Sequence, residues 1–337
     1  MIRCKAPLRI SFAGGGTDVS PFVEEHGGTV LNAAINLYSY CTLKPVEEDE
    51  IRIIDHDIGI EYVSKNGNPF KYDGVNDIAK AIINELLPLP GFELRLHTDA
   101  RRGTGLGSSS THAVTVLEAI YTWAGTELTS YDLAEKAYKI ERIDLDQKGG
   151  RQDQYSAVFG GINFIEFEKS GTLVNPLNIK DEVLKELDYR MVFCSLNNTR
   201  SSPEIISDQV KRYVGRKSDT VDALFNTKQI AFDMKRALLT GDIDEMGVLI
   251  NKSWQLKKDF SDHITNPTID EVYDYALANG AIGGKVLGAG GGGHMIFIAE
   301  SDSKWELESA LYSRNIVSLP IQLGVEGVRV WSSQTGW

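Results

Sequence analysis

The chain has 337 residues, enough for one large domain or two, and its 42% share of hydrophobic residues suits a globular protein. A formal net charge of −12 argues against a general nucleic-acid binder, because phosphate backbones are bound by clustered Lys and Arg, but it leaves room for a local nucleotide site. No apolar run approaches membrane-spanning length and no signal-peptide pattern opens the chain, so we expect a cytoplasmic protein without membrane or nucleic-acid partners.

The first predicted element is a strand over residues 2–13, which ends in the glycine-rich loop 14–18. Three glycines after a strand mark a tight loop where something approaches the backbone. Asp18 closes this loop and either grips substrate hydroxyls or caps the next helix near Pro21. Arg9 lies inside the strand, where it needs an anionic partner, either a core carboxylate or a phosphate.

Short elements follow up to residue 98. Residues 29–45 predict two strands with a bend near Asn36, and two more strands are expected over 51–55 and 60–64. A helix is expected over 76–87. Alternating apolar and polar residues over 92–98 then indicate a half-exposed strand.

The most informative stretch is the glycine-rich loop 101–110, in which three glycines within five residues run into three serines. Apolar residues at helical spacing over 111–124 predict that this loop leads into a helix. Such a junction offers unpaired backbone N–H groups and a partial positive charge, which favour a phosphate. A glycine-rich turn with a serine cap would show the same pattern. A Walker A loop is ruled out because no Lys follows the last glycine, and the spacing fits a Rossmann fingerprint poorly.

Two carboxylates come later in the chain. A helix that begins at a capping-box pattern at Thr129 and runs to about Arg142 carries Glu141 on its inner face. A carboxylate there must be paired, protonated or bound to metal, unless the helix end is hydrated. Asp153 lies in a polar cluster before small and apolar residues, which suits either a buried, oriented carboxylate or another helix cap.

The second half of the chain is richer in helices. They are predicted over 203–214, 221–239, 243–258 and 267–278, with start signals at Asp242 and Asn266. The rest of the pattern is a strand over 190–196, a further glycine-rich passage over 283–294, a strand over 295–299, a helix over 304–313 and two final strands. We expect two domains, 1–180 and 181–337, because residues 170–188 have the composition of a linker.

Four segments of the chain, taken in their order along it, resemble the motifs of one known protein family. They are Ala6-Pro7-Leu8-Arg9 with Thr17-Asp18, Gly103-x-Gly-Leu-Gly-Ser-Ser, Glu141 twelve residues before Asp153, and Gly288-Ala-Gly-Gly-Gly-Gly. Together they resemble the GHMP kinases, the group of galactokinase, homoserine kinase, mevalonate kinase and phosphomevalonate kinase. The resemblance covers nearly the whole chain. It implies an α+β fold with a ribosomal-protein-S5-type N-terminal domain, a ferredoxin-like C-terminal domain and an active site between them.

Within this group the chain is most similar to kinases of D-glycero-D-manno-heptose 7-phosphate. The resemblance therefore implies transfer of the ATP γ-phosphoryl group to the anomeric hydroxyl of this sugar, giving the 1,7-bisphosphate. Galactokinases carry a Glu-His pair where this chain has Gly15-Gly16, and fucose kinases share that departure in part. A fucose kinase, another sugar 1-kinase, or a non-catalytic sugar sensor on the same scaffold remain alternatives, although intact Glu141 and Asp153 argue against a sensor.

The resemblance also implies roles for residues, with ATP and Mg²⁺ as cofactors and a sugar phosphate as substrate. Asp153 would accept the proton of the attacking hydroxyl, and Arg9 would stabilise the transferring phosphoryl group. Ser109 and Glu141 would hold Mg²⁺, which prefers oxygen ligands. The residues expected to bind the ATP phosphates are Gly103, Thr104, Gly105, Leu106, Gly107, Ser108, Ser109 and Ser110.

The substrate side is expected to combine hydroxyl binding with a cationic grip on the existing phosphate. Asp18 would fix sugar hydroxyls. Arg101, Arg102 and Arg200 are candidates for the phosphate, unless these arginines are simply solvated, and Lys285 either faces the nucleotide or pairs with a surface acid. The oligomeric state is not defined by the sequence. The expected substrate residues are Gly15, Gly16, Thr17, Asp18, Arg102, Thr199, Arg200, Gly290 and Gly291.

Overall fold

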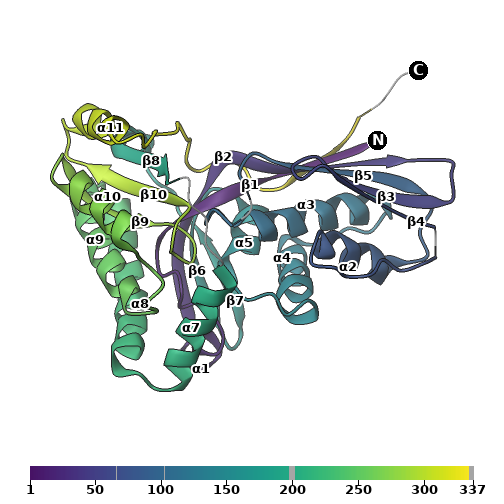
Figure 1. Cartoon of the computed structure of the whole chain (residues 1–337), viewed down its shortest axis with the longest axis horizontal. Coiled ribbons are helices and arrows are strands. Elements are labelled where there is room, and N and C mark those ends of the chain that lie inside the picture. Colours follow the sequence, from purple (N-terminus) through teal and green to yellow (C-terminus); the bar gives the residue numbers. More distant parts are fainter. Residues whose placement is uncertain (66, 102, 197–201, 334–337) are drawn as a thin grey trace.

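The computed structural model describes residues 1–65, 67–101, 103–196 and 202–333. These residues form one eight-stranded and one three-stranded sheet. In Figure 1 the three-stranded sheet lies at one end of the long axis and β3, β4 and β5 lie at the other, with β1 and β2 extending between them. In the described part of the chain no helix combines the length and apolarity that crossing a bilayer requires.

The eight-stranded sheet is organised around β2, which pairs with β1 on one side along most of its length. On its other side the first part of β2 pairs with β6 and the last part with β5. The remaining neighbours place β11 beside β1, β7 beside β6, and β3 between β5 and β4. The strands are β1 (Ile2–Ala13), β2 (Gly28–Pro45), β3 (Glu50–Asp55), β4 (Ile60–Lys65), β5 (Phe92–Thr98), β6 (Ile162–Glu168), β7 (Gly171–Pro176) and β11 (Arg329–Ser332).

The prediction of two strands over 29–45 was wrong, because β2 is one strand of 18 residues. The expected bend is present inside it. The register of β1 against β2 shifts between Pro7 and Leu8, whose partners are Tyr38 and Ile35, so an irregularity spans Asn36. Extra residues in one strand, here Asn36 and Leu37, bend the strand and increase its twist without ending the ladder.

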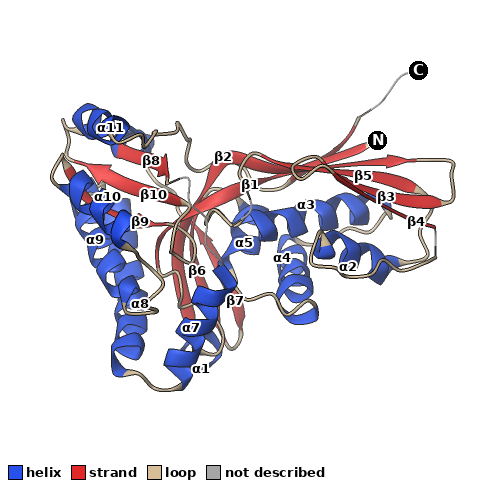
Figure 2. Ribbon diagram, in the orientation of Figure 1, coloured by secondary structure: helices blue, strands red, loops and turns tan. Residues whose placement is uncertain are grey.

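The helices α2, α3, α4 and α5 cover one face of this sheet, as Figure 2 shows. Their apolar side chains and the inward-facing residues of the sheet form one buried cluster. Within it, the α3 residues Ala113, Val116 and Ile120 are fully buried, which confirms the helical spacing read from the sequence. The helices are α2 (Asp77–Leu86), α3 (Ser108–Trp123), α4 (Ser130–Tyr138) and α5 (Gln152–Phe159).

The helix that carries Glu141 differs from the prediction in its last turns. Thr129 caps α4 by accepting a hydrogen bond from the Asp132 backbone N–H, as the capping pattern predicts. After Tyr138 the chain continues as a π-helix, η1 (Lys139–Asp144). A π-helix is a less stable geometry than an α-helix and is found frequently at functional sites.

The C-terminal half packs helices against the three-stranded sheet β8-β10-β9. The predicted start signals are confirmed: Asp242 accepts from Glu245 N at the start of α9, and Asn266 accepts from Ile269 N at the start of α10. The elements are β8 (Met191–Ser195), β9 (Ala281–Val286), β10 (His294–Ala299), α7 (Ser202–Val214), α8 (Ser218–Thr240), α9 (Ile243–Lys258), α10 (Pro267–Leu277) and α11 (Lys304–Ser313).

Several elements were not expected from the sequence. They are the strands β7 and β9, and the helix α6 (Asp181–Arg190), whose buried residues are only Leu187 and Arg190. The helix offered near Pro21 as one alternative for Asp18 is present as the short α1 (Phe22–His26). Of the two strands expected at the C-terminal end, the described residues contain one, β11. The predicted domain boundary near residue 180 falls between β7 and α6, and β11 returns to pair with β1. The boundary itself stays a prediction.

Candidate active site

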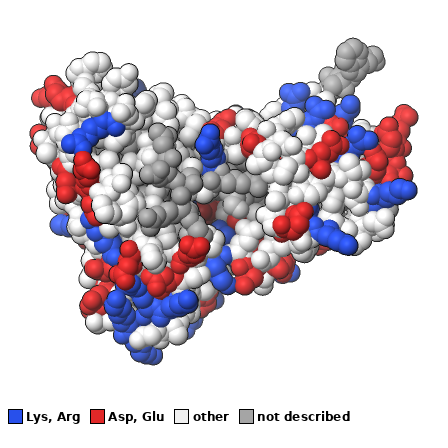
Figure 3. Space-filling view, viewed as in Figure 1, with Lys and Arg blue, Asp and Glu red and all other residues white. Residues whose placement is uncertain are grey.

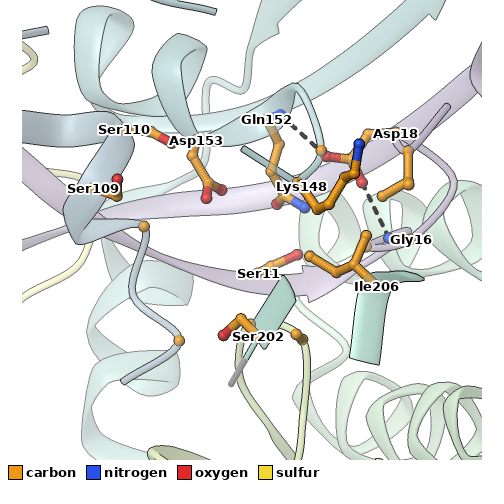
Figure 4. Close-up of a pocket in the computed structure, with 18 of the residues that line it drawn as sticks. Ser11, Gly16, Asp18, Ser109, Ser110, Lys148, Gln152, Asp153, Ser202 and Ile206 are labelled. Atoms are coloured by element: carbon orange, nitrogen blue, oxygen red, sulfur yellow. Dashed lines mark hydrogen bonds between the residues drawn. The ribbon is translucent and has the colours of Figure 1, made fainter. Parts of the chain in front are cut away.

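A cavity of about 680 Å³ opens between the two halves of the chain. Its wall includes β1, the first turn of α3, η1, α5, α7, α9 and the glycine-rich loops at residues 15–18, 103–107 and 288–289. Figure 4 shows side chains from β1, α3, α5 and α7 around it. Most of the residues expected at the site are in the lining: Arg9, Gly15, Gly16, Asp18, Gly103, Gly105, Gly107, Ser108, Ser109, Ser110, Glu141 and Asp153.

Other expected residues are not in this lining. Thr17 is buried and binds the Gly14 and Thr29 carbonyl oxygens. Gly290 and Gly291 lie against Ile264, whose carbonyl oxygen accepts from Gly291 N at 2.7 Å. Thr104 and Leu106 are buried outside the lining, and Arg101 is exposed outside it. Arg102, Thr199 and Arg200 lie outside the described residues.

The loop 103–107 is held by backbone contacts with distant segments. Arg9 N donates to Leu106 O at 3.1 Å. A Cβ atom placed on Gly288 would lie 2.4 Å from Gly105 Cα, so the two glycine-rich loops touch through their backbones. His294 Nδ1 lies 2.9 Å from Thr104 O and must donate there, because a carbonyl oxygen only accepts. The loop conformation therefore depends on both halves of the chain.

Arg9 and Asp153 form an ion pair beneath this loop. Arg9 Nε and Nη2 lie 2.7 and 2.6 Å from Asp153 Oδ1. Arg9 Nη1 donates to Gly105 O at 2.6 Å. Because both carboxylate contacts reach Oδ1, Oδ2 is left for another partner. The anionic partner that the strand position of Arg9 requires is thus Asp153, 144 residues away in the chain.

Asp18 caps a helix, but not the one expected near Pro21. Its Oδ2 accepts from the backbone N–H groups of Arg151 and Gln152 at 3.0 and 3.1 Å, and its Oδ1 accepts from Gly16 N at 3.0 Å. Dashed lines in Figure 4 mark this arrangement. Burial raises the pKa of the Asp18 carboxyl, the charge of Asp153 raises it further, and the backbone donors of Gln152 and Gly16 oppose this. Asp18 therefore fixes the start of α5, which carries Asp153.

Glu141 is fully buried at the far side of the same loop. Its Oε2 accepts from Ser110 Oγ at 2.6 Å and from Gln154 Nε2 at 2.7 Å. Its Oε1 lies 3.2 Å from Arg142 Nη1 but has no hydrogen-bond partner among the described residues. The serine that contacts Glu141 is thus Ser110, while Ser109 beside it lines the cavity.

This corner of the cavity has oxygen atoms that suit Mg²⁺. The described residues contain no group of three or more His, Cys, Asp or Glu that could hold a metal ion. Mg²⁺ in phosphoryl-transfer sites usually takes one or two carboxylates and completes its shell with phosphate oxygens and water. Glu141 Oε1, buried without a hydrogen bond, fits a ligand of that kind.

Sequence reasoning missed several cavity residues. Ser11 Oγ and Gln152 Oε1 are buried without hydrogen-bond partners in the described structure, and both residues line the cavity. Ser11 could have been found from Arg9, because residues two apart in a strand share a face. Lys257 lies 3, 7 and 11 residues after Trp254, Ile250 and Met246 of the same buried helix face, which was a signal for an inward-facing charge. Lys285 is buried in the wall of the cavity and does not pair with a surface acid.

Comparisons with known proteins identify the family of the chain. The family descriptions "GHMP kinases N terminal domain" and "GHMP kinases C terminal" match residues 73–161 and 234–315. The chain is 38% identical over 336 residues to D-glycero-alpha-D-manno-heptose 7-phosphate kinase of Campylobacter jejuni, with 98% of each chain covered.

Two further relatives are named for other sugar substrates. The crystal structure of a D-glycero-D-manno-heptose 1-phosphate kinase from Bacteroides thetaiotaomicron superposes with a TM-score of 0.83 at 34% identity, covering 99% of this chain and 100% of that one. L-fucokinase/L-fucose-1-P guanylyltransferase of Bacteroides fragilis is 29% identical over 88% of this chain, which spans 34% of that larger protein.

These matches confirm the expected two-domain α+β kinase fold over the length of the chain. The Arg9–Asp153 pair, the touching glycine-rich loops and the buried Glu141 lie around one cavity in that fold. The chain belongs to the GHMP kinase family.

Proposed function

We propose that this kinase transfers the γ-phosphoryl group of ATP to the anomeric hydroxyl of D-glycero-D-manno-heptose 7-phosphate, giving the 1,7-bisphosphate. The Arg9–Asp153 pair beneath the loop 103–107 carries the proposal, because it puts a carboxylate and a guanidinium where a bound triphosphate would end. The substrate is proposed from the similarity along almost the whole chain to a kinase named for that sugar.

The nucleotide side of the reaction needs donors for the phosphate oxygens. The loop 103–107 and the N-terminus of α3 supply backbone N–H groups at the cavity wall. Ser109 and Ser110 add hydroxyls in the first turn of α3, and Glu141, with one of these serines, would hold Mg²⁺. When bound, Mg²⁺ neutralises negative charge on the phosphates.

The sugar side needs a proton acceptor and an aligned hydroxyl. Asp153 Oδ2 would accept the hydroxyl proton, and Arg9 would favour the ionised carboxylate and the charge of the phosphoryl group. Phosphoryl transfer depends mainly on positioning and charge stabilisation, so this small set of groups can suffice. Four described residues of the wall have a buried polar atom without a hydrogen-bond partner: Ser11 Oγ, Ser108 Oγ, Glu141 Oε1 and Gln152 Oε1. Ser11 Oγ and Gln152 Oε1 would bind sugar hydroxyls, because Ser108 and Glu141 belong to the proposed nucleotide and metal side.

Asp18 is better supported as a positioning residue than as a ligand of the sugar. Both of its oxygens already accept backbone hydrogen bonds: Oδ1 from Gly16 N, and Oδ2 from the N–H groups of Arg151 and Gln152 at the start of α5. A role in fixing sugar hydroxyls remains the prediction made from the sequence.

Fucose is the second candidate substrate, because the Bacteroides fragilis relative named for it is 29% identical over most of this chain. The names of the heptose-kinase relatives also place the existing phosphate at position 7 in one case and position 1 in the other. Recognition of that phosphate is therefore the step that an experiment must resolve.

The test measures ATP consumption with heptose 7-phosphate, heptose 1-phosphate, unphosphorylated heptose and fucose, each with and without Mg²⁺. We expect the highest kcat/KM with heptose 7-phosphate and a product whose ³¹P NMR spectrum shows a new anomeric phosphate. Faster turnover of fucose or heptose 1-phosphate would reject the proposed substrate. Absence of phosphoryl transfer to any of the four sugars would favour the sensor alternative.

A further inference from the structure

Two lysines of the C-terminal half lie buried in the wall of the cavity. Lys257, near the end of α9, is 7% exposed, and Lys285, in β9, is 4% exposed. Both line the cavity. Within the described part of the chain neither ammonium group has a carboxylate at ion-pair distance, which is unusual because buried lysines are almost always paired.

Backbone carbonyl groups hold both ammonium groups in place. Lys257 Nζ donates to Val286 O at 3.2 Å and to Gly288 O at 2.5 Å. Lys285 Nζ donates to Phe12 O at 3.2 Å. An ammonium group has three N–H donors, so one donor of Lys257 and two of Lys285 have no partner among the described residues. The carbonyl oxygens of Val286, Gly288 and Phe12 belong to segments that flank the cavity.

The two lysines bring positive charge close to the Arg9–Asp153 ion pair. Burial lowers the pKa of Lys257, and the nearby charges of Lys285 and Arg9 lower it further. Burial and the charge of Arg9 lower the pKa of Lys285 to about 8. The carboxylate that pairs with Arg9 is Asp153, through its Oδ1. A buried cation without a counter-ion costs folding free energy that a bound anion would offset.

We propose that Lys257 and Lys285 form a cationic subsite that binds the oxygen atoms of a phosphoryl group beside Arg9. The inference rests on the proposed function, since it takes a phosphorylated ligand to enter this cavity. Two phosphoryl groups have the required chemistry: the phosphate that the sugar already carries, and the terminal phosphoryl group of the nucleotide. The described arginine expected for the sugar phosphate, Arg101, is exposed and lies outside the lining, which leaves this role to other cations.

The test uses Lys257→Met and Lys285→Met, which keep the length of the side chain and remove its charge. Lys252→Met is the matched control, because Lys252 is exposed on the same helix. Calorimetry gives Kd for heptose 7-phosphate, unphosphorylated heptose, ADP and the non-hydrolysable ATP analogue AMP-PNP. Thermal unfolding and circular dichroism report whether each variant is folded.

We expect Lys257→Met and Lys285→Met each to raise Kd for one phosphorylated ligand by about tenfold or more. This is the size of effect that losing a charge-assisted hydrogen bond produces. If the sugar phosphate is bound, Kd rises for heptose 7-phosphate but not for heptose or AMP-PNP. If the nucleotide is the source, Kd rises for AMP-PNP but not for ADP. Folded variants that bind all four ligands as the Lys252→Met control does would overturn the proposal.

The two variants make different demands on the fold. Lys285→Met removes one carbonyl contact and Lys257→Met removes two, so Lys285→Met decides the outcome if Lys257→Met does not fold. If neither folds, calorimetry of the unaltered protein at pH 8 in two buffers of different ionisation enthalpy replaces them. Proton uptake on binding the phosphorylated ligand supports the subsite, since an anion raises the pKa of a nearby lysine, and no uptake contradicts it.

These binding measurements are separate from turnover. If the unaltered protein phosphorylates fucose or another sugar instead, the proposed substrate is wrong, and AMP-PNP against ADP still tests the lysine subsite. If heptose 7-phosphate is turned over normally and the lysine variants bind every ligand as the control does, only the lysine subsite is wrong.

Discussion

The polar side chains at this site differ in how many of their hydrogen-bonding atoms already have a partner. Arg9 divides its donors between Asp153 Oδ1 and Gly105 O, so it ties the proposed base to the loop that would carry the triphosphate. Asp153 keeps Oδ2 for a further partner. Ser11 Oγ and Gln152 Oε1, by contrast, have no partner in the described structure. Arg9 and Asp153 therefore fix the position of the loop and the proposed base, whereas Ser11 and Gln152 are available to bind a ligand.

Replacing the proposed base tests the first of these roles. We expect Asp153→Asn to keep AMP-PNP binding and to lower kcat by about 10²- to 10⁴-fold, the usual contribution of a general base. The measurement is single-turnover transfer with saturating ATP and sugar, together with Kd for AMP-PNP. Turnover close to that of the unaltered enzyme would show that another group accepts the proton.

The buried Lys285 predicts a pH dependence of stability. Its pKa is lowered from 10.5 to about 8 in the folded chain, so between these values the unfolded state binds more protons than the folded state. The free energy of unfolding contributed by this group therefore rises as pH increases through that window, by about 3 kcal/mol at most. Lys285→Met lacks this titration. Its stability relative to the unaltered protein should fall from pH 8 to pH 10.5 in urea unfolding, and a constant difference would contradict a buried, charged lysine.

At the scale of elements, two helices present the acidic groups by different means. The helix α5 is started by Asp18, which lies more than a hundred residues earlier and accepts from its first N–H groups. The segment η1 changes the helix from α to π geometry where Glu141 turns to Ser110 and Gln154. In both cases a contact from outside the helix sets the position of the carboxylate.

The proposed binding of Mg²⁺ by Glu141 in η1 is tested by the variant Glu141→Gln, in which the side chain keeps its size and loses its charge. We expect the Mg²⁺ concentration for half-maximal activity to rise by about tenfold or more, because one of the few carboxylates available to the ion is lost. Asp144→Asn is the control, since Asp144 is exposed at the end of the same segment. Equal Mg²⁺ dependence of the two variants would remove Glu141 from the metal site.

Across the whole molecule the site depends on contact between the two halves. The loop 103–107 comes from the first half, and Gly288, Gly293 and His294 of the second half pack on its backbone. The face of the molecule that Figure 3 shows offers no comparable clue, because acidic and basic side chains are mixed over it. A net charge of −12 is thus compatible with an anion site whose cations are buried.

A side chain added between the loops at Gly105 and Gly288 should weaken nucleotide binding. In Gly288→Ala the new Cβ would lie 2.4 Å from Gly105 Cα, at a backbone φ of +66°, so the loops must move apart. We expect Kd for AMP-PNP to rise by about tenfold and stability to fall by about 1–3 kcal/mol. Gly74→Ala is the matched control, with φ of +88° and nothing within 4 Å of its Cβ. If both variants bind AMP-PNP equally well, contact between the loops does not shape the nucleotide site.

The sequence by itself determined the local features of this protein. The glycine loop that leads into α3, the caps of α4, α9 and α10, and the need of Arg9 for an anion were all predicted correctly, because each depends on residues a few positions apart or on the chemistry of one side chain. The ordered motifs added the family, which the comparisons confirm.

Only the tertiary structure decided which partners these residues meet. That Asp18 caps α5, that Glu141 meets Ser110, that β11 returns to β1 and that Lys257 faces the cavity all depend on segments far apart in the chain. Hydrophobic periodicity places a residue on a face of its own element but does not specify the opposing element. Packing and the pairing of buried polar groups settle that choice, because a buried charge or N–H group is stable only where the folded chain supplies its partner.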